Sequence, residues 1–157
     1  SDCMLSEYYH RPDATEKAFA EGWYLTGDYG YTVGEQVFVA GRKKEIIIVG
    51  GKNVYPMDLE ELAMQVPGVH AGRVVAFGLF NESTGTEEVV LVAEVDTADA
   101  QEREHIADAI RQTVTTGSAV ALRYVHLVEK KWLIKTSSGK NARLANKEKF
   151  MREMGLQ

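Results

Sequence analysis

Seven segments with regular hydrophobic patterns follow one another from Ile46 onward, and their order constrains the fold more than any other feature of the sequence. Short apolar runs predict strands, and apolar residues at helical spacing predict helices. The strands are expected over 46–49, 73–80, 88–95 and 122–128, and the helices over about 54–66, 98–116 and 141–154. The order strand, helix, strand, strand, helix, strand, helix favours an α+β domain in which helices pack against a small mixed sheet.

The residues before this domain contain too little apolar material for a core of their own. Pro12 is expected to begin a short helix. Residues 23–31 and 37–40 predict a hairpin around the turn at 33–36. The charged run 41–45 is interpreted as a linker between two packed units, so the part before it is expected to be the tail of something larger.

Composition excludes several classes of protein. The 157 residues contain one cysteine, which rules out an internal disulfide and is typical of a reducing compartment such as the cytoplasm. The four histidines show no metal-ligand spacing, so no metal site is expected. No apolar run reaches the ~18 residues that a membrane-spanning helix needs, and the first residues lack the pattern of a signal peptide.

The net charge of −5 conceals a basic segment near the C-terminal end. Residues 129–152 contain eight basic and two acidic side chains, whereas the remainder is acidic. Such a segment can attract an anionic ligand or partner. No signature of a nucleic-acid-binding module accompanies it, so we expect no binding of nucleic acid.

The loop Lys135–Lys140 is small and polar and ends in a lysine. We expect a flexible loop that can carry one ammonium group to an anion. It is not a P-loop, because Ile134 stands where that motif has its first glycine and Asn141 follows the lysine in place of Ser or Thr. Lys140 is therefore either an ordinary surface residue or part of a different phosphate chemistry.

Carboxylates at two further places could be functional or ordinary. Asp28 follows a glycine in the expected hairpin, where it would serve either turn formation or the recognition of vicinal sugar hydroxyls. Glu60 and Glu61 are adjacent on an expected helix, and adjacent helical residues do not face one site. We interpret this pair as solvated helix surface.

Four segments in this order and spacing resemble the adenylate-forming enzymes, which include acyl-CoA synthetases, luciferases and nonribosomal adenylation domains. The segments are Trp23–Asp28, Gly41–Glu45, Gly51–Glu60 and Lys135–Lys140. Within that superfamily, the run Ile46–Val49 followed by Gly-Lys-Asn and Tyr-Pro is most similar to the fatty acyl-AMP ligases.

The resemblance implies a domain organisation. Residues 1–43 would be the end of a large N-terminal adenylating domain, and residues 44–157 would be the small C-terminal lid domain. The family's Ser/Thr/Gly-rich phosphate loop and acyl pocket lie in the large domain and are absent from this sequence. The chain is therefore expected to be a fragment that is inactive alone.

The resemblance also implies a reaction and roles for five residues. A carboxylic acid, expected to be a fatty acid, reacts with ATP and Mg²⁺ to give acyl-AMP, and the acyl group then passes to a thiol. Lys140 matches the catalytic lysine, Asp28 the carboxylate that holds the ribose, and Arg42 its helper. Lys44 matches the hinge, and Lys52 stands where relatives carry a polar residue that approaches the phosphate. The Mg²⁺ ligands would lie outside this sequence.

Two departures from the family pattern leave the thiol open. Luciferase-like relatives carry a lysine in the strand after the hinge, and residues 46–49 contain none. Position 52 carries lysine in place of the usual arginine. The acceptor could be coenzyme A or the phosphopantetheine arm of an acyl carrier protein. An alternative function is a docking module without chemistry, whose basic segment Lys130–Arg152 would bind an acidic carrier protein.

Overall fold

The structure is a computed structural model that describes residues 3–156. The chain divides into two compact units between Lys44 and Glu45, and each unit is described by itself. None of the helices in the described part of the chain has the length and apolar character needed to cross a membrane.

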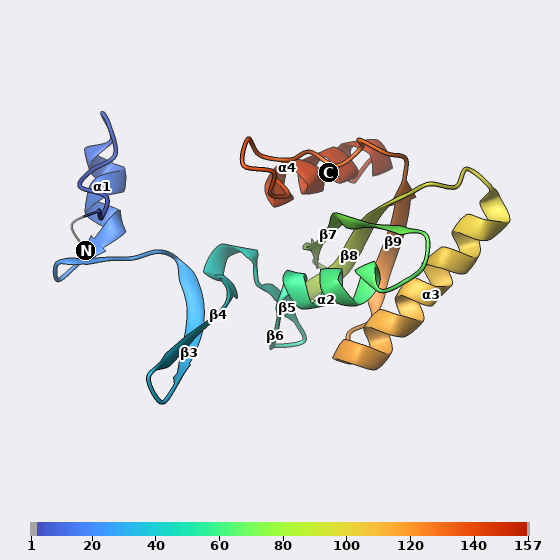
Figure 1. The fold of residues 1–157 in the computed structure, drawn as a ribbon, viewed down its shortest axis with the longest axis horizontal. Helices are drawn as coiled ribbons and strands as arrows, with labels where there is room; N and C mark the ends of the chain where they lie inside the picture. The colour runs from blue at the N-terminus through green and yellow to red at the C-terminus, as the bar shows by residue number, and fades with distance from the viewer. Residues whose placement is uncertain (1–2, 157) are drawn as a thin grey trace. The chain divides into compact units, whose positions relative to one another are not determined.

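A three-stranded sheet forms the centre of the second unit (Figure 1). Strands β7 (Val69–Asn81) and β8 (Thr86–Val95) form an antiparallel hairpin, and β9 (Leu122–Val128) pairs with β8 in parallel. Parallel neighbours need a crossover connection, which the helix α3 (Ala100–Ser118) supplies. The sheet is therefore mixed, as the sequence predicted.

Helices cover both faces of this sheet. Helices α2 (Pro56–Met64) and α3 pack on one face and α4 (Arg143–Met154) on the other (Figure 1). Alternate residues along each strand therefore enter different cores. The first core contains Leu59, Ala63, Val74, Ala76, Val89, Leu91, Ile106, Ile110 and Val114. The second contains Val75, Phe77, Val90, Val92, Leu133 and Phe150.

The central strand β8 shows why this sheet needs two layers of helices. Its residues Val89–Val95 are all buried, so the strand has no solvent-facing side over that length. A strand covered on both faces has a continuous apolar run in place of alternation, and residues 89–93 form such a run. The predicted α+β class with helices against a small sheet is confirmed.

A separate hairpin precedes α2 and differs from the expectation. We expected a buried strand over 46–49 followed by a turn through Asn53; the structure has β5 (Ile47–Val49) paired with β6 (Lys52–Val54). Ile47 is buried, whereas Ile48 is 52% exposed, because the hairpin covers the sheet with one face only. Gly50 and Gly51 form its turn at φ +55° and +79°, a conformation that favours glycine.

Element ends also differ by a few residues from those expected. Strand β7 begins at Val69, before the predicted start, and its pairing with β8 is irregular between Val69 and Val74. Helix α2 ends at Met64, before Pro67 and Gly68. Local pattern identifies each element here, while its ends depend on contacts with the rest of the sheet.

The first unit contains short elements and no buried residue between positions 3 and 44. Helix α1 (Pro12–Ala18) precedes two two-residue strands, β1 (Phe19–Ala20) and β2 (Trp23–Tyr24). Strands β3 (Asp28–Val33) and β4 (Gln36–Arg42) then form the expected hairpin, and a 3-10 turn spans Lys43–Glu45. All six residues of β3 are exposed. An isolated hairpin is at best marginally stable in water.

Candidate functional site

The loop that carries Lys140 is the tip of a short hairpin. Lys135 and Asn141 form an antiparallel bridge at its base. Within the tip, the Thr136 N–H donates to the Lys140 carbonyl at 2.8 Å, and the Gly139 N–H donates to the Thr136 carbonyl at 2.9 Å. Gly139 has φ +81°, which favours glycine. The sequence predicted a flexible loop; the structure shows a hydrogen-bonded turn.

The Lys140 side chain projects from this turn into solvent. It is exposed, and among residues 3–156 it forms no ion pair. An ammonium without an anionic partner, carried on an ordered turn, can interact with an anion brought to it from outside this unit.

Two asparagine side chains, one buried and one half-buried, hold both arms of the Lys140 hairpin. Asn146, on α4, is fully buried; its Oδ1 accepts from the Ile134 N–H at 2.8 Å, and its Nδ2 donates to the carbonyls of Ile134 and Ala142. Asn141 Nδ2 donates to the Val74 carbonyl of β7 at 2.7 Å. The hairpin is therefore tied to the sheet and to α4 together.

A third anchor lies just before the hairpin. Glu94, in β8, is 2% exposed, and its Oε1 accepts from the Leu133 N–H at 2.8 Å. Arg73 lies 3.7 Å from the same oxygen and offsets the buried charge. The sequence analysis missed Glu94 and Asn146, because a buried carboxylate or amide has no signature in hydrophobic pattern.

The first residue of α4, Arg143, joins a buried ion pair that the sequence analysis also missed. Its Nη1 contacts the Glu60 carboxylate and donates to the Ala76 carbonyl at 2.6 Å, and its Nε donates to Glu45 at 2.9 Å. The interpretation of Glu60 as solvated surface is wrong: Glu60 is 9% exposed and accepts from the Ala76 N–H at 2.8 Å. Glu60 lies among the buried residues of α2, with Leu59 and Ala63, while Glu61 stays exposed.

Burial and the neighbouring charges both shift the pKa values of Glu60 and Arg143. Burial raises the pKa of the Glu60 carboxyl, although the Arg143 guanidinium opposes the change. Burial lowers the pKa of the Arg143 guanidinium, but the Glu60 and Glu45 carboxylates outweigh this and leave it above its ordinary value. Arg143 is therefore a permanent cation within a largely buried pair.

Two expected site residues of the first unit lie side by side. Asp28 and Arg42 are opposite each other in the β3–β4 register, and Arg42 Nε is 3.4 Å from Asp28 Oδ1. The Asp28 side chain is one-third exposed, and that of Arg42 is two-thirds exposed. The Asp28 carboxylate and the Arg42 guanidinium are thus open to solvent in part, and a ligand's hydroxyls could bind them.

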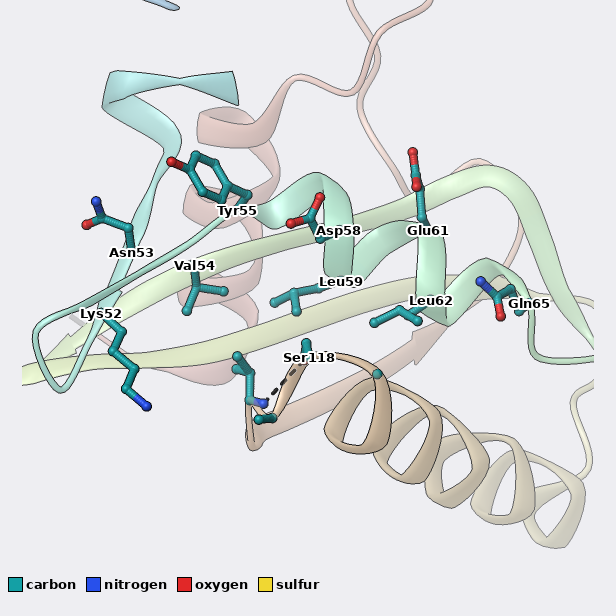
Figure 2. A pocket seen from close by; sticks show the side chains of 13 residues that line it. Lys52, Asn53, Val54, Tyr55, Asp58, Leu59, Glu61, Leu62, Gln65 and Ser118 are labelled. Atoms are coloured by element: carbon teal, nitrogen blue, oxygen red, sulfur yellow. Dashed lines mark hydrogen bonds between the residues drawn. The ribbon is translucent and has the colours of Figure 1, made fainter. Parts of the chain in front are cut away.

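Lys52 occupies a different place from Lys140. It lines a groove of about 490 Å³ between β6, α2 and the end of α3 with the two residues that follow it, and Lys140 is not among the lining residues. Figure 2 shows Lys52 extending from the β5–β6 hairpin, while Asp58 and Glu61 project from α2 on the opposite side of the view. The second unit therefore does not bring the two lysines to one site.

The remaining expected site residue, Lys44, is exposed at the boundary between the two units. For a metal ion, the described residues 3–156 offer no group of three or more His, Cys, Asp or Glu side chains. The donors present therefore do not fit Mg²⁺.

Comparison with known proteins places these features in a family. A family model described as the AMP-binding enzyme C-terminal domain matches residues 43–157. A putative acyl-CoA synthetase of Caulobacter vibrioides is 32% identical over 150 residues, covering 94% of this chain and 26% of that protein. The long-chain-fatty-acid–CoA ligase FadD13 of Mycobacterium tuberculosis is 44% identical over 86 residues, covering 54% of this chain and 17% of that protein.

Solved structures give the same result for the fold. The McyG A-PCP structure, complexed with phenylalanyl-adenylate, superposes with a TM-score of 0.80 at 31% identity, covering 95% of this chain and 26% of that one. A fatty acyl-adenylate ligase from the study of the E. coli and L. pneumophila enzymes gives 0.78 at 29% identity, covering 96% and 26%. The chain spans about a quarter or less of the length of the curated relatives described above. Their names, synthetase and ligase, do not favour a docking module without chemistry.

Proposed function

This chain belongs to the AMP-binding enzyme C-terminal domain family, and from that premise we propose that it is the C-terminal part of an ATP-dependent acyl-adenylating ligase. The substrate we propose is a fatty acid, which becomes acyl-AMP and is then transferred to a thiol. The name of the M. tuberculosis relative, a long-chain-fatty-acid–CoA ligase, supports both the fatty acid and coenzyme A. The A-PCP architecture of McyG supports a carrier-protein thiol as the other acceptor.

The proposed chemistry explains why an exposed lysine is needed. In the first step a carboxylate oxygen bonds to the α-phosphorus of ATP while the bond from that phosphorus to the pyrophosphate oxygen breaks. Two anions approach each other in this step, and negative charge builds up on the phosphate oxygens. An ammonium group placed beside them stabilises that charge more in the transition state than in the separated reactants. We assign this role to Lys140.

One observation carries the proposal: the Lys140 ammonium has no anionic partner among the described residues, yet the turn beneath it is held at both arms by buried and half-buried polar groups. Such a lysine is positioned in advance, so little ordering is required when the anion arrives. The motion that removes it before thiol attack would then be a rotation of the whole lid at Lys44, without unfolding of the loop.

The domain assignment is part of the same proposal. We propose that residues 1–43 are the end of a larger adenylating domain and that residues 44–157 are its lid. The absence of any buried residue over positions 3–44 supports this, since that unit has no core of its own. In the β3–β4 hairpin, Asp28 would accept hydrogen bonds from the ribose hydroxyls and Arg42 would hold Asp28 in place.

Two further assignments complete the proposal. Lys52 would approach phosphate groups in the thiol-transfer arrangement, because it lies on the β6 side of the unit and away from the Lys140 turn. The ligands of the Mg²⁺ that accompanies ATP would lie outside this chain, because the described residues offer no group of three or more His, Cys, Asp or Glu side chains. We also propose a cytoplasmic location, where ATP and coenzyme A are available and a reducing environment suits a chain with one cysteine.

The test is the substitution Lys140→Ala in the longer enzyme that contains this chain. ATP–pyrophosphate exchange, which reports the first step, should fall by at least about a hundredfold, as expected for loss of one transition-state charge contact. The matched control is Lys147→Ala, which removes a lysine from α4 and should leave the exchange rate unchanged. Wild-type exchange by the Lys140→Ala variant would refute the assignment.

A carrier-protein titration tests the alternative. Docking without chemistry predicts that an acyl carrier protein binds the 157-residue chain through residues Lys130–Arg152, while the longer protein shows no exchange activity at all. Exchange activity that depends on Lys140 would exclude that alternative.

A further inference from the structure

The outer edge of β7 is bound by side chains from two helices. In the order β7–β8–β9, β7 is an edge strand, so its outward N–H and C=O groups have no strand to pair with. At Ala76 the N–H donates to Glu60 of α2, and the C=O accepts from Arg143 of α4. Glu60 and Arg143 also contact each other. These three interactions fix the start of α4 against the sheet.

The same guanidinium reaches the first residue after the proposed hinge. Arg143 Nε donates to Glu45 Oε2 at 2.9 Å, and Glu45 directly follows Lys44. Arg143 also follows Lys140 by three residues. One side chain therefore connects the chain segment at the hinge with the hairpin that carries the lysine, across 98 residues of sequence.

Arg143 and Glu60 are more deeply buried than Glu45. The side chains of Arg143 and Glu60 are 12% and 11% exposed, so their pair is part of the framework of the unit. That of Glu45 is 39% exposed, so its contact with Arg143 can be lost without leaving a buried charge. Arginine suits this arrangement because its planar group donates along several fixed directions, here to two carboxylates and a carbonyl.

We propose that Arg143 is a positioning residue, which fixes the direction of the Lys140 hairpin relative to the chain at Lys44 through its contact with Glu45. This role rests on the proposed function above. When the lid rotates at Lys44, the Glu45–Arg143 contact makes the rotation of the hinge segment and the displacement of Lys140 one motion. Without the contact, the same rotation would place the lysine less accurately for adenylation, whereas thiol transfer, which does not use Lys140, would be little affected.

A spectroscopic experiment on the 157-residue chain tests the contact itself. The Arg143 Nε–H should exchange slowly with solvent in proton–nitrogen correlation spectra, because it donates to Glu45. In Glu45→Gln the Arg143 Nε–H should exchange with solvent faster by about fivefold or more, because its hydrogen bond to a neutral amide oxygen is weaker than that to a carboxylate. The control is Glu88→Gln, which removes the charge from another partly exposed ion pair, that with Arg123. It should leave the Arg143 signal unchanged.

A kinetic experiment on the longer enzyme tests the role. Glu45→Gln should lower kcat of ATP–pyrophosphate exchange by about tenfold, with little change in KM for ATP, as coupling energies between contacting residues allow. Thiol transfer from supplied acyl-adenylate should stay within about twofold of wild type. Glu88→Gln should change neither half-reaction.

Arg143→Lys gives a second, independent comparison. Lysine keeps the charge but cannot donate in all the directions that the guanidinium does. This variant should fold and show the same selective loss as Glu45→Gln, and the double variant should be no slower than Arg143→Lys alone. The positioning role would be overturned by additive losses of rate in the double variant or by an equal fall in both half-reactions. An unchanged rate of ATP–pyrophosphate exchange in Glu45→Gln would overturn it as well. If the wild-type longer enzyme shows no ATP–pyrophosphate exchange, the proposed function is overturned and the positioning role with it. That outcome holds whatever the exchange rate of the Arg143 Nε–H with solvent.

Discussion

Replacing Asn146 by alanine is the sharpest test of how the Lys140 hairpin is held. Asn146 is fully buried and makes three hydrogen bonds to the backbone at the base of the hairpin, with the Ile134 N–H, the Ile134 carbonyl and the Ala142 carbonyl. The substitution removes all three and introduces no new group. Its effect therefore measures what this one side chain contributes.

The cost can be worked out group by group. The carbonyls of Ile134 and Ala142 keep other donors, the backbone N–H groups of Ala142 and Asn146, at 3.0 Å each. The Ile134 N–H has no other acceptor among the hydrogen bonds of the described residues, so it becomes a partly buried unsatisfied donor, at a cost of about 1–3 kcal/mol. The carbonyls of Ile134 and Ala142 each lose one hydrogen bond as well. Together with the unsatisfied N–H, this should lower the free energy of unfolding by about 3 kcal/mol.

Urea unfolding of the 157-residue chain, followed by circular dichroism, measures this loss. Helices α2, α3 and α4 all lie in the second unit, so the helical signal reports mainly that unit. The control Asn53→Ala removes an exposed asparagine and should change the free energy of unfolding by less than about 0.5 kcal/mol. Hydrogen exchange should also show that the Ile134 amide loses its protection. A loss below about 1 kcal/mol, or an Ile134 amide that stays protected, would refute the reasoning.

Three other outcomes are expected. Gly78→Ala should cost about 1–3 kcal/mol in urea unfolding, because a Cβ there would lie 2.5 Å from Glu87 Oε1 and 2.8 Å from Ile47 Cγ2. Burial lowers the pKa of His126, which contacts the Phe150 ring. The folded state thus favours the uncharged imidazole. The contribution of His126 to the free energy of unfolding is therefore fully present above the ordinary histidine pKa and is lost as pH falls through the lowered pKa. His126→Phe should flatten the fall in stability between about pH 7.5 and about pH 5 in matched urea titrations. In the longer enzyme, Asp28→Asn should raise KM for ATP by about tenfold or more while changing kcat less, which initial-rate kinetics would measure.

Most of the fold could be predicted from the sequence because the second unit is locally consistent. Strand β9 was expected over 122–128 and occurs there. Helix α3 has Ile106, Ile110 and Val114 buried, at the helical spacing on which its prediction depended. What the pattern did not give was the β5–β6 pairing, because a three-residue strand next to Gly50 and Gly51 resembles a turn in sequence.

The candidate site was predictable only in part. Lys140 and the Asp28–Arg42 pair stand out as charged residues beside glycines or turns, and the structure places Asp28 and Arg42 in contact. The groups that hold the lysine hairpin, above all Asn146 and Glu60, are polar residues in helices. Their burial arises only when α4 and α2 pack against the sheet, and a residue's own neighbours in sequence carry no information about that packing.

The occupied backbone groups of Val74 and Ala76, on the edge strand β7, have a consequence for the behaviour of the protein in a crowded solution. Unpaired backbone groups along an outer strand are where foreign strands add and fibrous aggregates start. Here the Val74 carbonyl and both backbone groups of Ala76 are already occupied by Asn141, Glu60 and Arg143. A foreign strand therefore cannot pair with this part of β7 while these three side chains keep their contacts.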